Sequence, residues 1–342
     1  MTVRARPLRW VTRPMAFAVG FALACAGLDR LVEPIRAGGG KVEWFRDHGA
    51  GYDALFVGSS RTARGVVPSV FDGAMAEAGR PVRSFNLALP GMWPPEDGYV
   101  IERALERRDA PLAFLIVECN ALRLGTPPGD QDTSRAVYWH DAERLRALWR
   151  RAFAPESASP EAPPDPRAVR QNLEALAEHV RYFAWNAARL GRGAELLRDA
   201  LGAKRTQPAA PALGPAGDGY APRRSRAPLR GEALAVYEQE LRRATAGRER
   251  HSFADVESQA ELRRKRALAE RYGARLVLVA PPITGGVFAP LPELGAAFLD
   301  FSDPARVPEL FAPEHRKDGG HLNALGAELY SRLLARGIAA LR

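Results

Sequence analysis

The sequence predicts an α/β protein, a three-layer α/β/α sandwich around a central parallel sheet with a helical insertion in the middle of the chain. Short apolar runs, typical of buried strands, alternate with helical patterns from residue 53 to residue 117. A fourth such run, residues 275–280, follows two amphipathic helical patterns. Strands that alternate with helices form a parallel sheet with helices on both faces. A chain of 342 residues is long enough for one such domain and an insertion.

The first part of the sandwich is assigned to residues 37–125, after an N-terminal segment of residues 1–36 and a glycine hinge at residues 37–40. The predicted elements, in order, are a strand at residues 55–57, a helix at 70–78, a strand at 82–87, a turn at 90–91, a helix at 99–107 and a strand at 112–117.

The insertion is assigned to residues 126–230 and the second part of the sandwich to residues 231–342. Helical spacing at 138–153 and 169–201 predicts two helices, separated and followed by linker-like stretches at 155–166 and 207–228 that are rich in proline and alanine. The later predicted elements are helices at 232–245 and 253–272, a strand at 275–280, a loop at 282–289, a helix at 291–299, a short strand at 298–301 and a final helix from residue 324.

Two serines follow the first buried strand directly. Gly58 ends the strand and frees the backbone for a sharp turn, and Ser59 and Ser60 come next. A serine on such a turn presents its hydroxyl at the carboxyl edge of the sheet, where open α/β folds keep their sites. An alternative interpretation is that Ser59 or Ser60 only caps the following helix.

A possible base for a serine nucleophile lies near the other end of the chain. Asp318 precedes His321 by three residues with two glycines between them, on a loop before the final helix. A carboxylate there can reach Nδ1 of the imidazole and leave Nε2 for Ser60, which makes a Ser-His-Asp triad. The remaining histidines lack such a partner and are expected on the surface or in packing: His48, His140, His179, His251 and His315.

These segments resemble the blocks of the SGNH (GDSL-like) hydrolase superfamily. Gly58-Ser59-Ser60 resembles the first block, with Ser60 as nucleophile, and Asp318 to His321 resembles the last. The stretch ending at Gly91 resembles the second block, whose glycine N–H helps to bind the oxyanion. Asn120 stands at the asparagine of the third block, although Glu118 occupies the place of that block's glycine. The resemblance implies an SGNH/flavodoxin-like fold and covers roughly residues 50–125 and 265–342.

Composition excludes several other classes of function. The net charge of +9 comes from arginines spread along helices and linkers, and no zinc spacing or basic motif interleaved with aromatics is present, so nucleic acid is not an expected partner. Cys25 and Cys119, the two cysteines, are not expected to form a disulfide, and no metal or cofactor site is indicated. Cys119 is interpreted as a small buried residue at a strand end.

The N-terminal segment indicates export. Four arginines, with no acidic residue among them, precede an uncharged apolar run at residues 15–28. This predicts either an uncleaved single-pass anchor in the cytoplasmic membrane with the folded body on its outer side, or a signal peptide cleaved near Ala26 that leaves a secreted or periplasmic protein.

The expected chemistry is acyl-ester cleavage through a Ser60 acyl-enzyme, with the Ser60 and Gly91 N–H groups and the Asn120 amide as oxyanion donors. Water as acceptor makes an esterase, and a sugar hydroxyl makes an O-acyltransferase. The N-terminal segment and the Gly-Ser-Ser form resemble membrane-tethered envelope proteins of alginate O-acetylation and of the D-alanyl-lipoteichoic-acid family. That resemblance implies acetyl groups of an exported or cell-envelope glycan and a membrane-embedded acyl-transfer partner. The alternatives are a binding or assembly protein of a polysaccharide export system with little turnover, and a secreted esterase.

Overall fold

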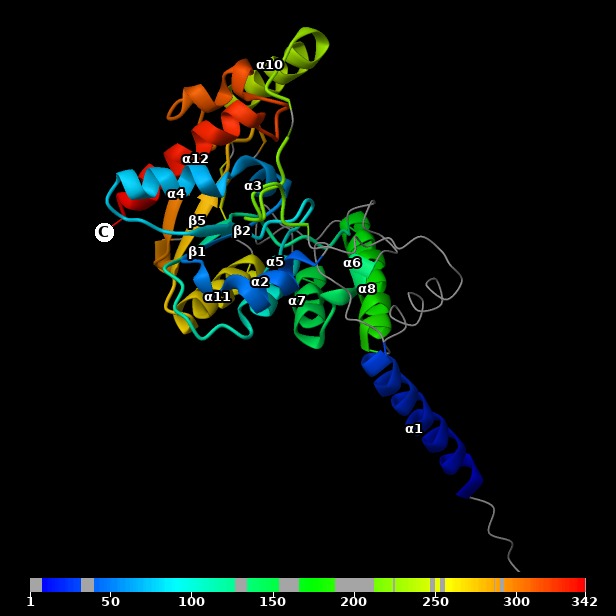
Figure 1. Ribbon diagram of the computed structural model, residues 1–342. Helices are drawn as coiled ribbons and strands as arrows, with labels where there is room; N and C mark the ends of the chain where they lie inside the picture. The colour runs from blue at the N-terminus through cyan, green and yellow to red at the C-terminus, as the bar shows by residue number, and fades with distance from the viewer. Residues whose placement is uncertain are drawn as a thin grey trace, which may run out of the picture.

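The computed structural model describes residues 8–31, 40–126, 134–153, 166–187, 212–223, 225–246, 250–252, 256–285, 287–289 and 292–341. These residues form an α/β fold around a five-stranded sheet with helices on both faces (Figure 1). The predicted class is therefore confirmed at the level of an α/β sandwich with a parallel central sheet.

The central sheet consists of β1 (Ala54–Val57), β2 (Ser84–Asn86), β3 (Phe114–Glu118), β5 (Arg275–Ala280) and β7 (Ala297–Asp300). The strands lie in the order β2-β1-β3-β5-β7, and each neighbouring pair is parallel. Counted along the chain this is the order 2-1-3-4-5, in which the topological switch point lies between the first and third strands. Ligands of open α/β sheets bind at the carboxyl ends of the strands beside this point. Ser60 follows β1 and Asn120 follows β3, so both residues flank the switch point.

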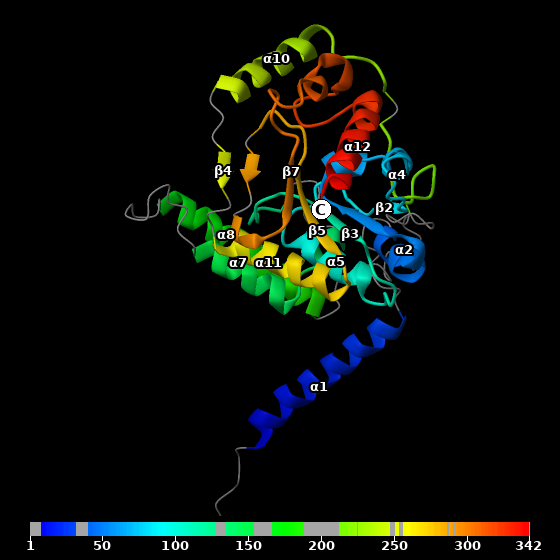
Figure 2. The ribbon, with the colours of Figure 1, turned by 90° about the vertical axis from the view of Figure 1, so that its left-hand side faces the viewer.

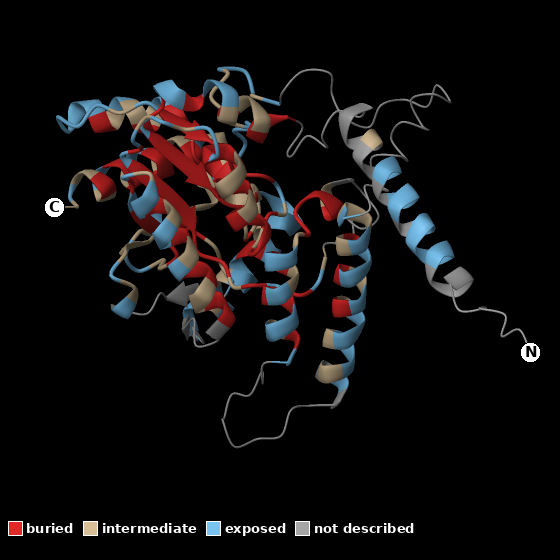
Figure 3. Ribbon diagram, turned by 90° about the horizontal axis from the view of Figure 1, so that it is seen from below, coloured by how far each residue is buried: buried red, intermediate tan, exposed pale blue. Residues whose placement is uncertain are grey.

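Helices pack on both faces of the sheet (Figure 2). One face carries α2 (Lys41–His48), α5 (Glu96–Leu105) and α11 (Val256–Arg271), and the other carries α3 (Ser60–Gly65), α4 (Pro68–Glu77) and α12 (Ala324–Ala339). Side chains of β1 alternate between two apolar cores, with Leu55 and Val57 in the first and Phe56 in the second. Figure 3 shows the strands as the buried centre between helices with exposed outer faces. Burial on both faces explains why these strands are continuous apolar runs in the sequence.

The insertion contributes α6 (Ser134–Tyr138), α7 (Ala142–Phe153) and α8 (Pro166–Ala187). Tyr138 of α6 donates a hydrogen bond of 2.6 Å to Glu96 of α5. Two buried imidazoles join the insertion to the loop after β3. His140 Nε2 lies 2.7 Å from His179 Nδ1, and His179 Nε2 lies 2.5 Å from the Leu124 carbonyl oxygen. Of the two roles expected for these histidines, packing is the one found.

Two predicted helices are corrected. The helix predicted at residues 291–299 is wrong: the 3-10 turn η2 (Pro292–Leu294) is followed by Gly295, with φ of 62°, and then by β7, which pairs with β5. Pairing with the sheet overrides the local helical pattern, and the strand predicted at residues 298–301 is confirmed. The helix predicted at residues 138–153 is interrupted between α6 and α7, where Asp141 Oδ1 accepts a hydrogen bond of 2.8 Å from the Arg144 N–H.

A strap of residues 212–223 and 225–230 replaces part of the predicted linker at residues 207–228. Its backbone bonds to three parts of the sandwich: Asn86 N–H donates to Asp218 O (2.8 Å), Ala221 N–H to Ala63 O (3.1 Å) and Leu229 N–H to Pro313 O (3.0 Å). The strap therefore runs across α3 to the loop before α12. The stretch at residues 155–165 and the end of the helix predicted at residues 169–201, beyond residue 187, lie outside the described residues.

The remaining described elements lie before, between and after these parts. They are α1 (Leu8–Leu31), η1 (Gly49–Gly51), α10 (Gly231–Ala246), a small parallel sheet of β4 (Arg250–Ser252) with β6 (Val287–Ala289), η3 (Pro308–Phe311) and η4 (Pro313–His315). The N-terminal apolar run forms part of α1. None of the helices in the described residues has the length and hydropathy that a membrane span needs.

Candidate active site

The structure brings Ser60, His321 and Asp318 together from opposite ends of the chain. Ser60 Oγ lies 2.8 Å from His321 Nε2, and His321 Nδ1 lies 2.8 Å from Asp318 Oδ1. Because a charged carboxylate can only accept, Nδ1 carries the proton in this bond and Nε2 of the neutral ring is left as an acceptor for the serine hydroxyl. The arrangement has the connectivity and the distances of a nucleophile, a base and a group that orients the base.

The environment of Asp318 keeps its carboxyl group charged. Partial burial raises its pKa, but the hydrogen bond and charge of His321, the hydrogen bond from the Gly320 N–H (2.9 Å) and the charge of Arg223 outweigh burial, so the pKa is lowered overall. A charged carboxylate at neutral pH is what stabilises an imidazolium when the ring takes a proton.

The two serines of the turn have different tasks. Ser59 is the N-cap of α3, and its Oγ accepts a hydrogen bond from the Arg61 N–H at 3.3 Å. Ser60 is the first residue of that helix, and its hydroxyl is directed to His321 instead. The capping interpretation therefore holds for Ser59 and fails for Ser60.

A buried arginine, Arg316, holds the loop that carries Asp318. Its guanidinium donates to the carbonyl oxygens of Pro282 (2.9 Å), Asp318 (3.0 Å) and Gly319 (2.6 Å). The side chain is fully buried. On the other side of His321, Asn323 caps α12 by accepting from the Gly326 N–H at 3.0 Å. The loop is thus fixed at both ends, which places Asp318 and His321 relative to the sheet.

The Glu118 carboxylate holds the serine turn through hydrogen bonds. It accepts from the Ser59 N–H (2.8 Å), the Thr62 hydroxyl (2.7 Å) and Arg61 Nε (2.6 Å), and it is almost fully buried. Burial raises the pKa of Glu118, but the charge of Arg61 and the hydrogen bonds from Thr62 and Ser59 lower it overall. A Cβ at Gly58 would lie 2.5 Å from the Glu118 carboxylate, so this position requires glycine while Glu118 is present.

The two predicted oxyanion residues lie at the correct sheet edge. Asn120 is buried just after β3, and its Oδ1 accepts a hydrogen bond of 2.5 Å from Arg61. Because guanidinium has no acceptor, this bond fixes the carbonyl side of the amide toward Arg61 and turns Nδ2 away from it. Gly91 lies in the turn after β2 with φ of 74°, close behind Leu89, whose N–H donates to Gly58 O at 3.0 Å. Oxyanion binding by Asn120 and by the N–H groups of Gly91 and Ser60 stays a prediction.

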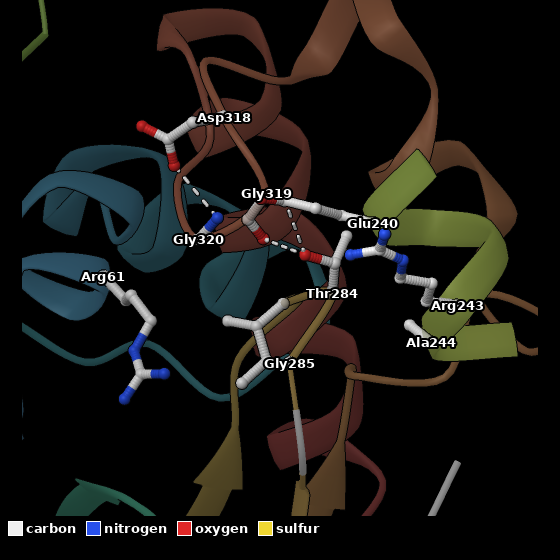
Figure 4. A pocket seen from close by; sticks show the side chains of 10 residues that line it. Arg61, Glu240, Arg243, Ala244, Thr284, Gly285, Asp318, Gly319 and Gly320 are labelled. Carbon is white, nitrogen blue, oxygen red and sulfur yellow. Dashed lines mark hydrogen bonds between the residues drawn. The ribbon is translucent and has the colours of Figure 1, made fainter. Parts of the chain in front are cut away.

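An open cleft of about 640 Å³ adjoins the Asp318 loop. Figure 4 shows Arg61 on one side of it and Glu240 and Arg243 of α10 on the opposite side, with Thr284 and the loop of residues 318–320 between them. The Thr284 hydroxyl lies 3.3 Å from both the Gly319 carbonyl oxygen and Glu240 Oε2. Charged side chains share the lining of the cleft with Ala244 and Ile283, and such a mixed polar and apolar wall suits a ligand such as a sugar.

Arg61, Glu118 and Arg316 belong to the site although the sequence analysis assigned them no role in it. Two of them could have been found from the sequence. Arg61 follows Ser60 directly, and Glu118 stands where the resembled block has glycine. Cys119 is buried, and burial raises the pKa of its thiol, in agreement with a packing role. Among the described residues no cluster of potential metal ligands was found.

Comparison with known proteins adds no relative: no family model, curated protein or solved structure matches this chain. The function of this chain is therefore inferred from the geometry of the site.

Proposed function

We propose that this chain is a serine-dependent acyl-ester hydrolase or O-acyltransferase of the SGNH type. The observation that carries the proposal is the pair of 2.8 Å contacts that link Ser60 Oγ to His321 and His321 to Asp318. A surface serine beside a helix needs neither contact, whereas nucleophilic catalysis needs both.

In the proposed reaction Ser60 Oγ attacks the ester carbonyl while His321 Nε2 takes the hydroxyl proton. The oxyanion is held by the N–H groups of Ser60 and Gly91 and by the Asn120 amide, and such donors are each worth about 10²–10³ in rate. His321 then gives the proton to the departing alcohol, which leaves an ester on Ser60. Water or a sugar hydroxyl, deprotonated by the same imidazole, attacks this ester and restores Ser60.

The proposed substrate is an acylated glycan outside the cytoplasmic membrane. The open cleft beside Asp318, with charged groups in its wall, supports a sugar as the alcohol. The four arginines before an apolar run support export. Acetyl is the acyl group that the resemblance to tethered envelope proteins implies, and a membrane-embedded acyl-transfer protein is the implied partner. The N-terminus of the mature chain, measured by mass spectrometry, separates an anchor from a signal peptide cleaved near Ala26.

A fluorophosphonate probe tests the proposal. The folded wild-type chain is expected to be labelled covalently, and labelling is expected to be lost in Ser60→Ala, because only an activated serine reacts with the probe. Ser69→Ala is the matched control, since Ser69 is an exposed serine of α4 outside the site. A folded wild type that stays unlabelled would refute the enzyme and favour a binding or assembly protein with the same fold.

A further inference from the structure

A second, smaller hollow lies beside the cleft, at the carboxyl ends of β3, β5 and β7. It has a volume of about 190 Å³, and Asn120, Pro281 and Ser302 lie in its wall. Arg61, the residue after Ser60, lines both this hollow and the cleft. The loop of residues 318–320 lines the cleft alone. The two hollows therefore share Arg61, the residue next to the proposed nucleophile, and only the cleft borders the Asp318 loop.

The chemistry of the proposed reaction assigns a different half of the ester to each hollow. The departing alcohol receives its proton from His321, whose partner Asp318 lines the cleft, so the alcohol is assigned to the cleft. The acyl chain is assigned to the other hollow, which shares Arg61 with the cleft and has Asn120 in its wall. Since it is smaller than the pockets of about 300–1,000 Å³ that hold drug-sized ligands, it suits a short acyl group.

The wall of the small hollow is positively charged. Arg123 and Arg61 both contribute to it, and both guanidinium groups lie over the indole of Trp93, at 3.4 Å and 5.1 Å from the ring centroid. Glu118 neutralises Arg61 at 2.6 Å, but among the described residues no carboxylate lies within ion-pair distance of Arg123. Partial burial of the guanidinium and the charge of Arg61 both lower the pKa of Arg123. The stacked indole holds the Arg123 fork in place for a planar anion.

We propose that the small hollow is the acyl pocket and that it selects a short acyl group ending in a carboxylate, of the succinyl type, through Arg123. This assignment rests on the proposed function, with a succinyl-type group in place of acetyl as the acyl group. Attack by Ser60 then forms a half-ester of the dicarboxylic acid on its oxygen and releases the alcohol with the proton from His321. Water completes the cycle by releasing the free dicarboxylate, or a sugar hydroxyl takes the acyl group. Neither step needs an oxidant, a reductant or a further reactant.

The test compares two aryl esters that differ in the acyl group, para-nitrophenyl hemisuccinate and para-nitrophenyl acetate, on the full chain. The ratio of kcat/KM for hemisuccinate over acetate is expected to be about 10 or more, because a hydrogen bond to a charged partner is lost with acetate. Arg123→Gln is expected to bring the ratio to about 1, and Arg123→Lys to an intermediate value. Arg123 is exposed, so these variants are expected to fold, and Arg332→Gln, an exposed arginine of α12 outside both hollows, should leave the ratio unchanged.

The assignment is overturned if the hemisuccinate-to-acetate ratio is near 1 in the wild type, or if Arg123→Gln does not change it. It is also overturned if the chain prefers para-acetoxybenzoate, which carries its carboxylate on the alcohol, and if that preference depends on Arg123. A chain that turns over none of the esters is tested through the fluorophosphonate reaction instead. Succinate is expected to slow labelling of Ser60 more than acetate does, and only while Arg123 is present. Labelling without this protection refutes the acyl pocket alone, whereas no labelling refutes the proposed function and the pocket with it.

Discussion

Replacing Asp318 with asparagine is expected to lower kcat on an activated ester about 10⁴-fold while the fold is retained. The neutral amide can donate to Nδ1, which favours the tautomer with the proton on Nε2, and Ser60 then loses its acceptor. It also removes the negative charge that stabilises the imidazolium. The measurement is kcat on an aryl ester at pH 7–8, with circular dichroism to verify folding.

Asp47→Asn supplies the matched control. Asp47 forms an exposed pair with Arg46 at 2.9 Å on α2, so its loss should leave kcat unchanged and stability almost unchanged. A folded Asp318→Asn variant that keeps the wild-type kcat would exclude Asp318 from the relay.

Replacing Glu118 with alanine is expected to lower the free energy of unfolding by about 3–5 kcal/mol. The change leaves the Arg61 charge without its carboxylate and takes the acceptor from Ser59 and Thr62 in a buried site, and breaking a buried pair from one side costs this much. Urea unfolding measures the loss. Glu106→Ala is the control, because the exposed pair of Glu106 with Arg103 on α5 is worth at most about 1 kcal/mol.

The contribution of Glu118 to the free energy of unfolding also depends on pH. Its folded pKa is lowered, so the stabilisation is fully present above the ordinary glutamate pKa of about 4.3 and is lost as the pH falls toward the folded value. The difference in unfolding free energy between wild type and Glu118→Ala should therefore shrink below about pH 4. A difference that stays constant down to pH 3, or one under 1 kcal/mol at pH 7, would show that the pair does not hold the turn.

The serine turn and the aspartate loop could be predicted from sequence because local rules determine both. An apolar run ended by Gly58 predicts a buried strand and a turn, and the spacing of Asp318 and His321 places a carboxylate within reach of an imidazole. That these segments meet follows from the parallel sheet, which gathers the carboxyl ends of its strands at one edge. The distances that join them had to come from the structure.

The parts of the structure that could not be predicted depend on contacts between residues far apart in the sequence. β7 pairs with β5 although the helix predicted at residues 291–299 overlaps its first three residues. The strap is fixed by backbone bonds to Ala63 and Pro313, for which the sequence holds no side-chain pattern. Glu118 and Arg61 are 57 positions apart and interact only because β1 and β3 are neighbours. Local pattern specifies elements, whereas partners across the sheet depend on the topology.

Trapping the acyl-enzyme decides whether Ser60 is the nucleophile. The wild-type chain is mixed with an aryl ester, quenched in acid within seconds and digested, and the peptides are weighed by mass spectrometry. One acyl group is expected on Ser60, and no adduct is expected in His321→Ala, which lacks the base. An adduct on another residue, one that forms equally without His321, or none in a folded wild type that the fluorophosphonate probe also leaves unlabelled would contradict the account.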